Sequence, residues 1–218
     1  MRIILYILLI SLSCSFSFSQ KITPKFTYNV ELGLPIALAN EPFNAVMQGL
    51  VGVSTYVQYT TPFHLNVGVG GKYSLFTINE FKVPVALNGS VHSAAGFVKV
   101  GYDKFLTERF AIDFGVKIGY SVNFSAVKEL DFDNNVITRY NNQNDAILVE
   151  PNLSLILSAD ERSSYRFYLG YNIHGYGFKP SFIGLQSNSG WDPNGFDKLT
   201  QYLIVGFGYT YYFKNNKQ

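Results

Sequence analysis

One segment, residues 110–124, alternates between two kinds of side chain without a break. Its even-numbered positions are all large and apolar, and its odd-numbered positions are charged, polar or small. A period of two is the period of a β-strand, and the run is far longer than the usual ~5–6 residues. One apolar face and one polar face suit hydrocarbon on the outside and a wet, crowded interior. The segment therefore predicts a strand of a transmembrane β-barrel.

More segments alternate in the same way, at residues 25–37, 47–59, 64–76, 94–102, 146–158, 165–176 and 199–213. The connections are expected to be short near 60–63, 103–108 and 159–164, and long near 38–46, 77–93, 128–145 and 177–198. Tight turns at one end and long loops at the other are typical of outer-membrane barrels. The predicted fold is all-β: an eight-stranded antiparallel up-and-down transmembrane β-barrel.

The composition favours a wall that faces lipid. Charged residues make up 15% of the chain and aromatic residues 17%, whereas soluble domains carry ~25% charged residues. A soluble eight-stranded barrel would turn its apolar face inward and its polar face to water. The polar face of these strands has few charges and many glycines, which suit a narrow lumen better. The net charge of +2 gives no reason to propose a nucleic acid partner.

The first 19 residues have the pattern of a secretory signal peptide. Arg2 supplies a positive charge, residues 3–10 are apolar, and small residues precede Gln20. Cleavage is expected to leave Gln20 first, so that residues 20–218 form one outer-membrane β-barrel domain. Cys14, the only cysteine, leaves an alternative open, in which the chain is cleaved at that cysteine and lipidated. The expected location is the outer membrane, reached by signal-peptide-dependent export, with membrane lipid around the wall.

Several charged residues fall on the inward faces of the predicted strands. They are Glu31, Lys72, Lys99, Asp113, Lys117, Glu150 and Arg166. An unpaired charge in a low-dielectric lumen costs several kcal/mol, so we expect these groups to pair with one another. A paired network would fill the lumen and close it to solutes. A gated or leaky conduit is the alternative, although eight strands leave little room for a channel.

The histidines give little support to catalysis. A serine hydrolase needs a nucleophile and a base within hydrogen-bond reach. We expect His64 at a turn, His92 in a loop and His174 in the lumen, and the His-x-Ser of lipid A deacylases is absent after His174. The sequence therefore predicts no enzyme activity.

One loop has a partial metal-binding pattern. Asp131, Asp133 and Asn135 resemble the start of a calcium loop, but Val136 and Asn142 stand where such a loop needs glycine and glutamate. A solvated acidic loop is the expected structure. The few histidines and the one cysteine form no transition-metal pattern, so we expect no metal and no cofactor.

Two of the long connections are unexpectedly apolar. Their candidate external contact residues are Val83, Val85, Leu87, Phe182, Ile183 and Trp191. Exposed apolar loops can mark a binding surface, here for an envelope protein partner. The alternative is that these residues pack together and cap the mouth of the barrel.

Aromatic residues gather at the expected periplasmic ends of the strands. They are Phe26, Tyr28, Tyr59, Phe63, Tyr102, Phe105, Phe110, Tyr165, Phe167, Tyr211 and Phe213. Aromatic rings prefer the boundary between lipid headgroups and hydrocarbon, so the pattern predicts a girdle there.

The last predicted strand carries Tyr209, Tyr211 and Phe213 and resembles the terminal signal that the barrel-assembly machinery reads, although residues 214–218 follow it. Other resemblances are the Ser-Phe-Ser-Gln cleavage region, the Val100-Gly101-Tyr102 strand end and the run from Arg109 to Tyr120. With these features the mature chain resembles the small outer-membrane β-barrel proteins of Bacteroidota, including the PorT-like group. The resemblance implies the barrel-assembly machinery as a partner, and some members of the group assist secretion or gliding. It implies no functional residue.

The expected function is that of a non-enzymatic integral outer-membrane barrel with a structural or loop-mediated interaction role in the envelope. The alternatives are a secretion-associated barrel, a lipid-modifying outer-membrane enzyme and a narrow solute pore.

Overall fold

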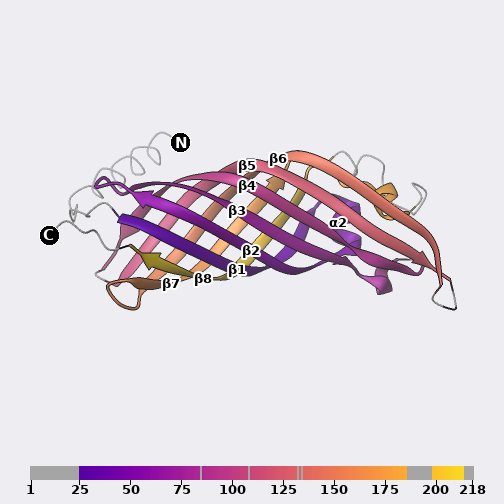
Figure 1. The fold of residues 1–218 in the computed structure, drawn as a ribbon, viewed down its shortest axis with the longest axis horizontal. Coiled ribbons are helices and arrows are strands. Elements are labelled where there is room, and N and C mark those ends of the chain that lie inside the picture. Colours follow the sequence, from indigo (N-terminus) through magenta and orange to yellow (C-terminus); the bar gives the residue numbers. More distant parts are fainter. Residues whose placement is uncertain are drawn as a thin grey trace, which may run out of the picture.

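The structure is a computed structural model that describes residues 25–83, 85–107, 109–131, 133, 135–185 and 198–213. The strands of these residues pair in chain order, all antiparallel, and β1 pairs with β8 to close the barrel (Figure 1). They are β1 (Lys25–Ala39), β2 (Met47–Thr60), β3 (Leu65–Ile78), β4 (Leu87–Phe105), β5 (Phe110–Leu130), β6 (Val136–Ser158), β7 (Ser163–His174) and β8 (Thr200–Tyr212). The predicted eight-stranded antiparallel up-and-down barrel is confirmed.

The two ends of the barrel differ. The short connections between β2 and β3, between β4 and β5 and between β6 and β7 lie at one end, which we call the turn end. The opposite end, which we call the capped end, carries α2 (Glu41–Val46) and the 3₁₀ helices η2 (Glu80–Lys82) and η3 (Pro180–Ile183). Among the described residues, no helix is both long enough and apolar enough to cross a bilayer.

The two faces of β5 point as the alternation predicts. Phe114 and Ile118 are 51% and 55% exposed on the outer wall, whereas Asp113 is fully buried in the lumen. The other strands also turn large apolar side chains outward, among them Leu32, Val69, Val98, Ile147, Leu157 and Phe207. An outer wall of this kind is stable when hydrocarbon rather than water surrounds it. Because the barrel is closed, no strand edge is left without backbone hydrogen bonds in that hydrocarbon.

Three strands are longer than predicted. β5 and β6 have 21 and 23 residues, so most of the predicted loop at 128–145 is strand, and only residues 131–135 connect the two. β4 likewise begins at Leu87, so the predicted loop at 77–93 ends earlier. Asn88 and Gly89, which fall within that predicted loop, instead pair with Lys128 and Val127 of β5.

This extension, residues 87–93 of β4, 122–130 of β5 and 136–146 of β6, continues the wall beyond the capped end of the other strands. We call it the outer ribbon. The sequence hides it because polar side chains occupy both faces of residues 141–144, so no apolar period marks a strand there. Pairing with the neighbouring strand supplies the backbone hydrogen bonds that continue the sheet.

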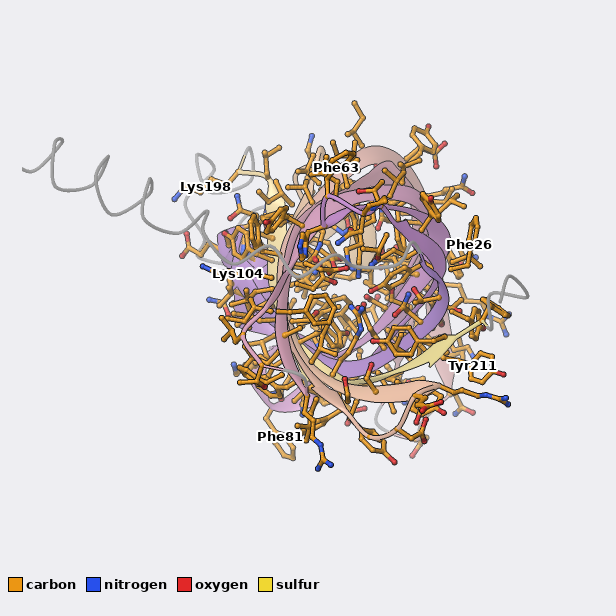
Figure 2. All side chains as sticks on the ribbon, turned by 90° about the vertical axis from the view of Figure 1, so that its left-hand side faces the viewer. Phe26, Phe63, Phe81, Lys104, Lys198 and Tyr211 are labelled. Atoms are coloured by element: carbon orange, nitrogen blue, oxygen red, sulfur yellow. The ribbon has the colours of Figure 1, made fainter. Side chains whose placement is uncertain are left out.

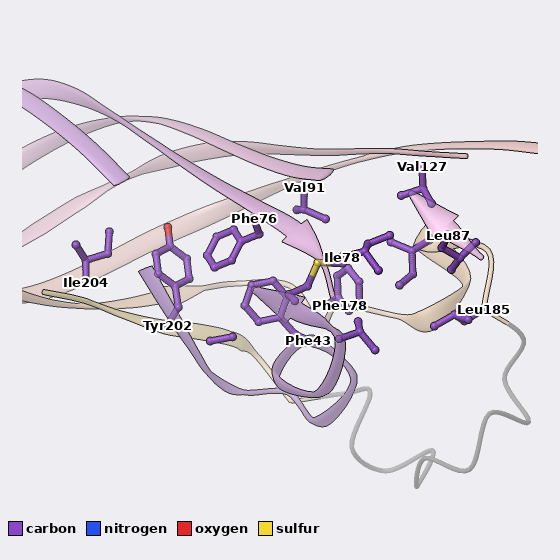
Figure 3. Packing of buried hydrophobic residues seen from close by; sticks show 14 of the residues in the cluster. Phe43, Phe76, Ile78, Leu87, Val91, Val127, Phe178, Leu185, Tyr202 and Ile204 are labelled. Atoms are coloured by element: carbon purple, nitrogen blue, oxygen red, sulfur yellow. The ribbon is translucent and has the colours of Figure 1, made fainter. Parts of the chain in front are cut away.

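An apolar cluster fills the capped end of the lumen (Figure 3). Phe43 of α2 packs edge-on against Phe76 and Phe178, with ring centroids 5.0 and 5.5 Å apart. The strands and η3 contribute further buried residues, including Ile78, Leu87, Val91, Val127, Ile183, Tyr202 and Ile204. We call this cluster the cap.

Asn40 fixes α2 in the cap. It adopts φ 71°, a left-handed value that asparagine tolerates better than most residues. Its side-chain oxygen accepts from the backbone N–H of Phe43 at 3.1 Å. Its side-chain nitrogen donates to the carbonyl oxygens of Phe178 and Lys198, both at 3.0 Å. One amide therefore holds the β1–β2 and β7–β8 connections together.

Aromatic side chains surround the turn end, as Figure 2 shows from that side with Phe26, Phe63 and Tyr211 labelled. All three are exposed, Phe26 and Tyr211 on strands and Phe63 in the β2–β3 turn, as a girdle at the headgroup boundary requires. The turns themselves are polar. At the β6–β7 turn Asp160 accepts 2.7 Å hydrogen bonds from the Ser163 hydroxyl and the Arg162 backbone N–H, which lower the pKa of its carboxyl.

We expect a charged side chain on the outer wall to destabilise the barrel more the closer it lies to the bilayer midplane. Val116 lies midway along the apolar stretch of β5, and Val116→Lys should lower the free energy of unfolding by ~2–4 kcal/mol. Asn141→Lys, on the outer face of the ribbon, should change it by less than ~0.5 kcal/mol. Urea unfolding in phosphatidylcholine vesicles measures both, and equal effects would contradict a lipid-facing wall.

Candidate functional site: the lumen and the outer wall

The structure places all seven charged residues predicted to face inward inside the lumen, each at most 7% exposed. Antiparallel register explains how they meet. Lys117 of β5 lies directly opposite Glu150 of β6 and directly opposite Lys99 of β4. Because inward residues at one level share a narrow space, charges from distant parts of the sequence become neighbours.

The ionic cluster nearer the cap has two cations and two anions. Lys117 Nζ lies 2.7 Å from Glu31 Oε2 and 2.9 Å from Glu150 Oε1. Lys72 pairs with the other oxygen of Glu150 and donates to the side chain of Asn172. Each carboxylate therefore has a cation partner, which offsets the desolvation of these charges.

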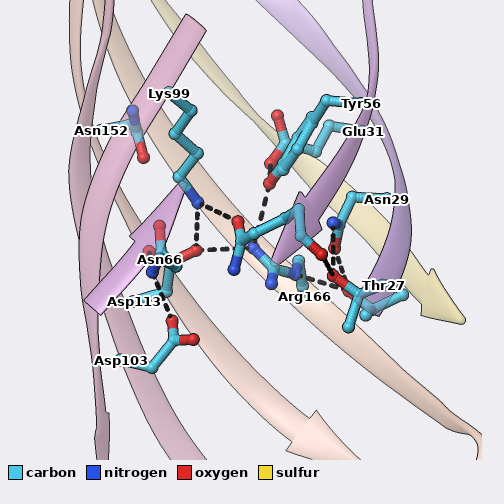
Figure 4. A network of polar contacts seen from close by, with 12 residues as sticks. Thr27, Asn29, Glu31, Tyr56, Asn66, Lys99, Asp103, Asp113, Asn152 and Arg166 are labelled. Atoms are coloured by element: carbon cyan, nitrogen blue, oxygen red, sulfur yellow. Dashed lines mark hydrogen bonds and ion pairs between the residues drawn. The ribbon is translucent and has the colours of Figure 1, made fainter. Parts of the chain in front are cut away.

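The cluster nearer the turn end is built around Asp113 (Figure 4). Asp113 Oδ2 lies 2.5 Å from Lys99 Nζ and 2.8 Å from Arg166 Nη1. Tyr56 links this cluster to the other one, since its hydroxyl donates to Glu31 Oε1 at 2.7 Å and accepts from Arg166 Nη1 at 3.1 Å. A continuous chain of polar contacts therefore runs along the lumen.

An eighth buried charge, Asp103, was missed by sequence reasoning because the fourth strand was predicted to end at residue 102. Asp103 accepts 3.0 Å hydrogen bonds from the Thr60 hydroxyl and the Asn66 amide. It shares the odd-numbered inward register of Lys99, and that parity could have revealed it. With Asp103 the buried side chains of the described lumen include four acidic groups and four Lys or Arg side chains.

His174 forms a layer of polar hydrogen bonds between the ion pairs and the cap. Its Nδ1 lies 3.0 Å from the Ser121 hydroxyl and its Nε2 lies 3.2 Å from the Tyr202 hydroxyl. The ring is 1% exposed, so this serine–histidine pair is closed to substrates. The lumen location predicted for His174 is confirmed.

His92 does not lie in a loop as predicted. It belongs to β4, and its even-numbered register turns it to the outer wall. Its Nε2 lies 2.7 Å from the Ser90 hydroxyl and its Nδ1 lies 2.5 Å from the Tyr73 hydroxyl. The ring stacks on Phe124 at 4.6 Å. The prediction failed because the ribbon strand was not recognised, and with it a serine–histidine contact was overlooked.

Most of the candidate contact residues pack into the cap. Leu87 and Ile183 are fully buried, which confirms for them the alternative of packing at the barrel mouth and makes their assignment to an external contact surface wrong. Val83 and Phe182 are partly buried against the same cluster, Val85 is exposed, and Trp191 lies outside the described residues. The apolar residues of these connections reach the mouth of the barrel because burial there removes them from water.

The aromatic residues at the end of the chain face outward. Tyr209 and Tyr211 of β8 and the following Phe213 are exposed on the outer wall. Within the described ranges, no three His, Cys, Asp or Glu side chains are grouped as metal ligands would be.

The sequence matches no protein-family model and no curated protein. Among solved structures, a major outer membrane protein from Thermus thermophilus is 12% identical over 88% of this chain and 100% of its own, with a TM-score of 0.57. Neisserial surface protein A is 11% identical over 88% of this chain and 100% of its own, at 0.49. The outer membrane protease OmpT from Escherichia coli is 9% identical over 90% of this chain and 100% of its own, at 0.47. The likeness to the Thermus thermophilus protein, together with the closed antiparallel topology, shows that the chain has the fold of a bacterial outer-membrane β-barrel.

Removing one lumen carboxylate should strongly destabilise the barrel. Asp113→Asn leaves Lys99 and Arg166 without their shared anion, and the expected loss is ~3–5 kcal/mol of unfolding free energy. Adding Lys99→Met should restore part of it, because one of the two orphaned cations is then gone. Asp145→Asn, on the exposed outer face of β6, is the matched control and should cost less than ~1 kcal/mol. Urea titration in detergent micelles gives the values, and equal losses for Asp113→Asn and the control would refute the pairing argument.

Proposed function

We propose that this protein is an integral, non-enzymatic barrel of the bacterial outer membrane that is closed to solutes. Its role in envelope structure and interaction is carried by its outer wall and outer ribbon. The observation that supports this most directly is the occupied lumen, where charged side chains are at most 7% exposed and lie beneath an apolar cap. A lumen filled in this way stabilises the wall around it.

A solute pore is disfavoured by the same contacts. A passing solute would have to separate buried ion pairs, and breaking such a pair costs ~3–5 kcal/mol. It would then have to displace the cap, in which Phe43 packs between Phe76 and Phe178. Two barriers of different chemistry therefore close the same path.

Features near the two ends of the chain support export and insertion into the outer membrane by the barrel-assembly machinery. Residues 1–19, which lie outside the described residues, have the signal-peptide pattern that would direct export. Tyr209 and Tyr211 near the end of β8 and Phe213 directly after it turn their aromatic side chains outward, which is the form of signal that the barrel-assembly machinery would read. The resemblance to the PorT-like barrels of Bacteroidota supports the same route. The secretion-associated role of some PorT-like barrels is the less favoured proposal for this protein, because the resemblance implies no functional residue for that role.

One observation favours a second candidate, a lipid-modifying enzyme. Ser90, His92 and Tyr73 form a hydrogen-bonded chain on the outer wall, with the hydroxyl and imidazole in the contact a nucleophile and a base would make. Against it, Ser90 pairs with strands on both sides, so the sheet already uses the backbone donors that would stabilise an oxyanion. Tyr73 also stands where a carboxylate would orient the base.

Fatty-acid release from lipid A or phospholipid vesicles separates the two candidates. We expect the purified protein and Ser90→Ala to release equal, background amounts. Release by the unmodified protein that Ser90→Ala abolishes would establish the enzyme.

We expect no stable conductance from the protein in planar bilayers, because paired charges and the cap occupy the lumen. Phe43→Ala should loosen the cap and leave the barrel closed, since the ionic clusters lie beneath it. Stable open channels in the unmodified protein would refute the proposed closure.

A further inference from the structure

The outer ribbon presents two cations side by side. Lys128 of β5 and Arg139 of β6 lie directly opposite each other and point outward. Like charges in this arrangement destabilise a sheet. No ion pair of the described residues includes either side chain, and neighbouring Glu129 turns inward to the Tyr140 hydroxyl. An external anion would relieve this repulsion.

The same face is hollowed. A cavity of about 630 Å³ is lined by Asn88, Ser90, Lys128, Arg139 and Asn141, together with apolar residues. Its lining thus combines cationic groups with neutral hydrogen-bond donors, which suits the oxygens of an acidic headgroup.

A second hollow of about 460 Å³ lies lower on the same wall, and its lining includes Val53, Tyr73, Ala94, Tyr120 and Val122. Gly71 and Gly96, paired across β3 and β4, form its floor. A Cβ on Gly96 would meet no atom within 4 Å, and one on Gly71 would approach only the Ala95 carbonyl oxygen, at 3.5 Å. The protein's own packing therefore does not require glycine at these positions, and their absent side chains leave an open apolar groove.

Polar contacts connect the two hollows. Tyr73 lines the groove and Ser90 lines the upper hollow, and His92 hydrogen-bonds to both. Ala94 and Asn88 are six residues apart on β4, which corresponds to ~20 Å of strand. That span suits a large amphiphile whose acyl chain and acidic groups are well separated.

We propose that this face binds one acylated lipid whose phosphorylated headgroup carries a net negative charge, with an acyl chain in the groove and its phosphate at Lys128 and Arg139. The proposal rests on the proposed function in one respect, that the barrel lies in the outer membrane. A small free anion would leave the groove empty, and a lipid without net negative charge would leave the positive charge of Lys128 and Arg139 uncompensated.

Native mass spectrometry of the detergent-purified protein, incubated with lipid A, phosphatidylglycerol and phosphatidylcholine, tests the proposal. The unmodified protein should retain one molecule of lipid A or phosphatidylglycerol, whose headgroups carry a net negative charge, in preference to zwitterionic phosphatidylcholine. Lys128→Ala/Arg139→Ala should lower retention about thirtyfold, from two lost cation contacts. Gly96→Leu, which fills the groove, should lower it about tenfold. Lys104→Ala, at the turn end, and Val98→Leu, below the groove, are the matched controls and should retain lipid normally.

Unchanged retention by Lys128→Ala/Arg139→Ala, or equal retention of phosphatidylcholine by the unmodified protein, would overturn the proposal. Displacement of the lipid by inorganic phosphate would also overturn it, because the site would then be one for a free anion. Bilayer conductance distinguishes these failures from failure of the proposed function. An open pore would contradict closure whatever lipid is bound, whereas loss of lipid selectivity would leave a closed barrel.

Discussion

The closed ladder of backbone hydrogen bonds is the constraint on which the rest of the structure depends. In hydrocarbon no water is present to hydrogen-bond the backbone N–H and C=O groups at the edge of a sheet. The last strand must therefore pair with the first. Closure by pairing of β1 with β8 then forces every second side chain into a narrow interior. The charges that meet there have no solvent, and they are stable only because they meet one another.

The interior of the barrel changes character along its axis. Ion pairs fill the part nearer the turn end, a layer of hydrogen bonds around His174 follows, and an apolar cluster closes the other end. Tyr56 joins the two ionic clusters because its hydroxyl can donate to one and accept from the other. Polar groups are thus buried where partners surround them, and apolar side chains lie where the mouth of the barrel would otherwise face water.

The features that follow from strict alternation could be predicted from the sequence. The inward position of Lys117 and the outward position of Ile118 follow from parity alone. The outer ribbon could not be predicted, since residues 141–144 are polar on both faces and their strand depends on pairing with β5. The misplacement of His92 and the omission of Asp103 follow from the same difficulty, because periodicity locates the middle of a strand better than its ends. The contacts of Asn40 depend on tertiary structure and leave no pattern in the sequence.

The unequal strands give the molecule a slanted rim. β6 has 23 residues and the adjacent β7 has 12. Residues 136–146 of β6 therefore pair with β5 on one side and with no described strand on the other. Hydrocarbon could not satisfy the backbone groups along that open side, so the slant of the rim limits how deeply the barrel can sink into a bilayer.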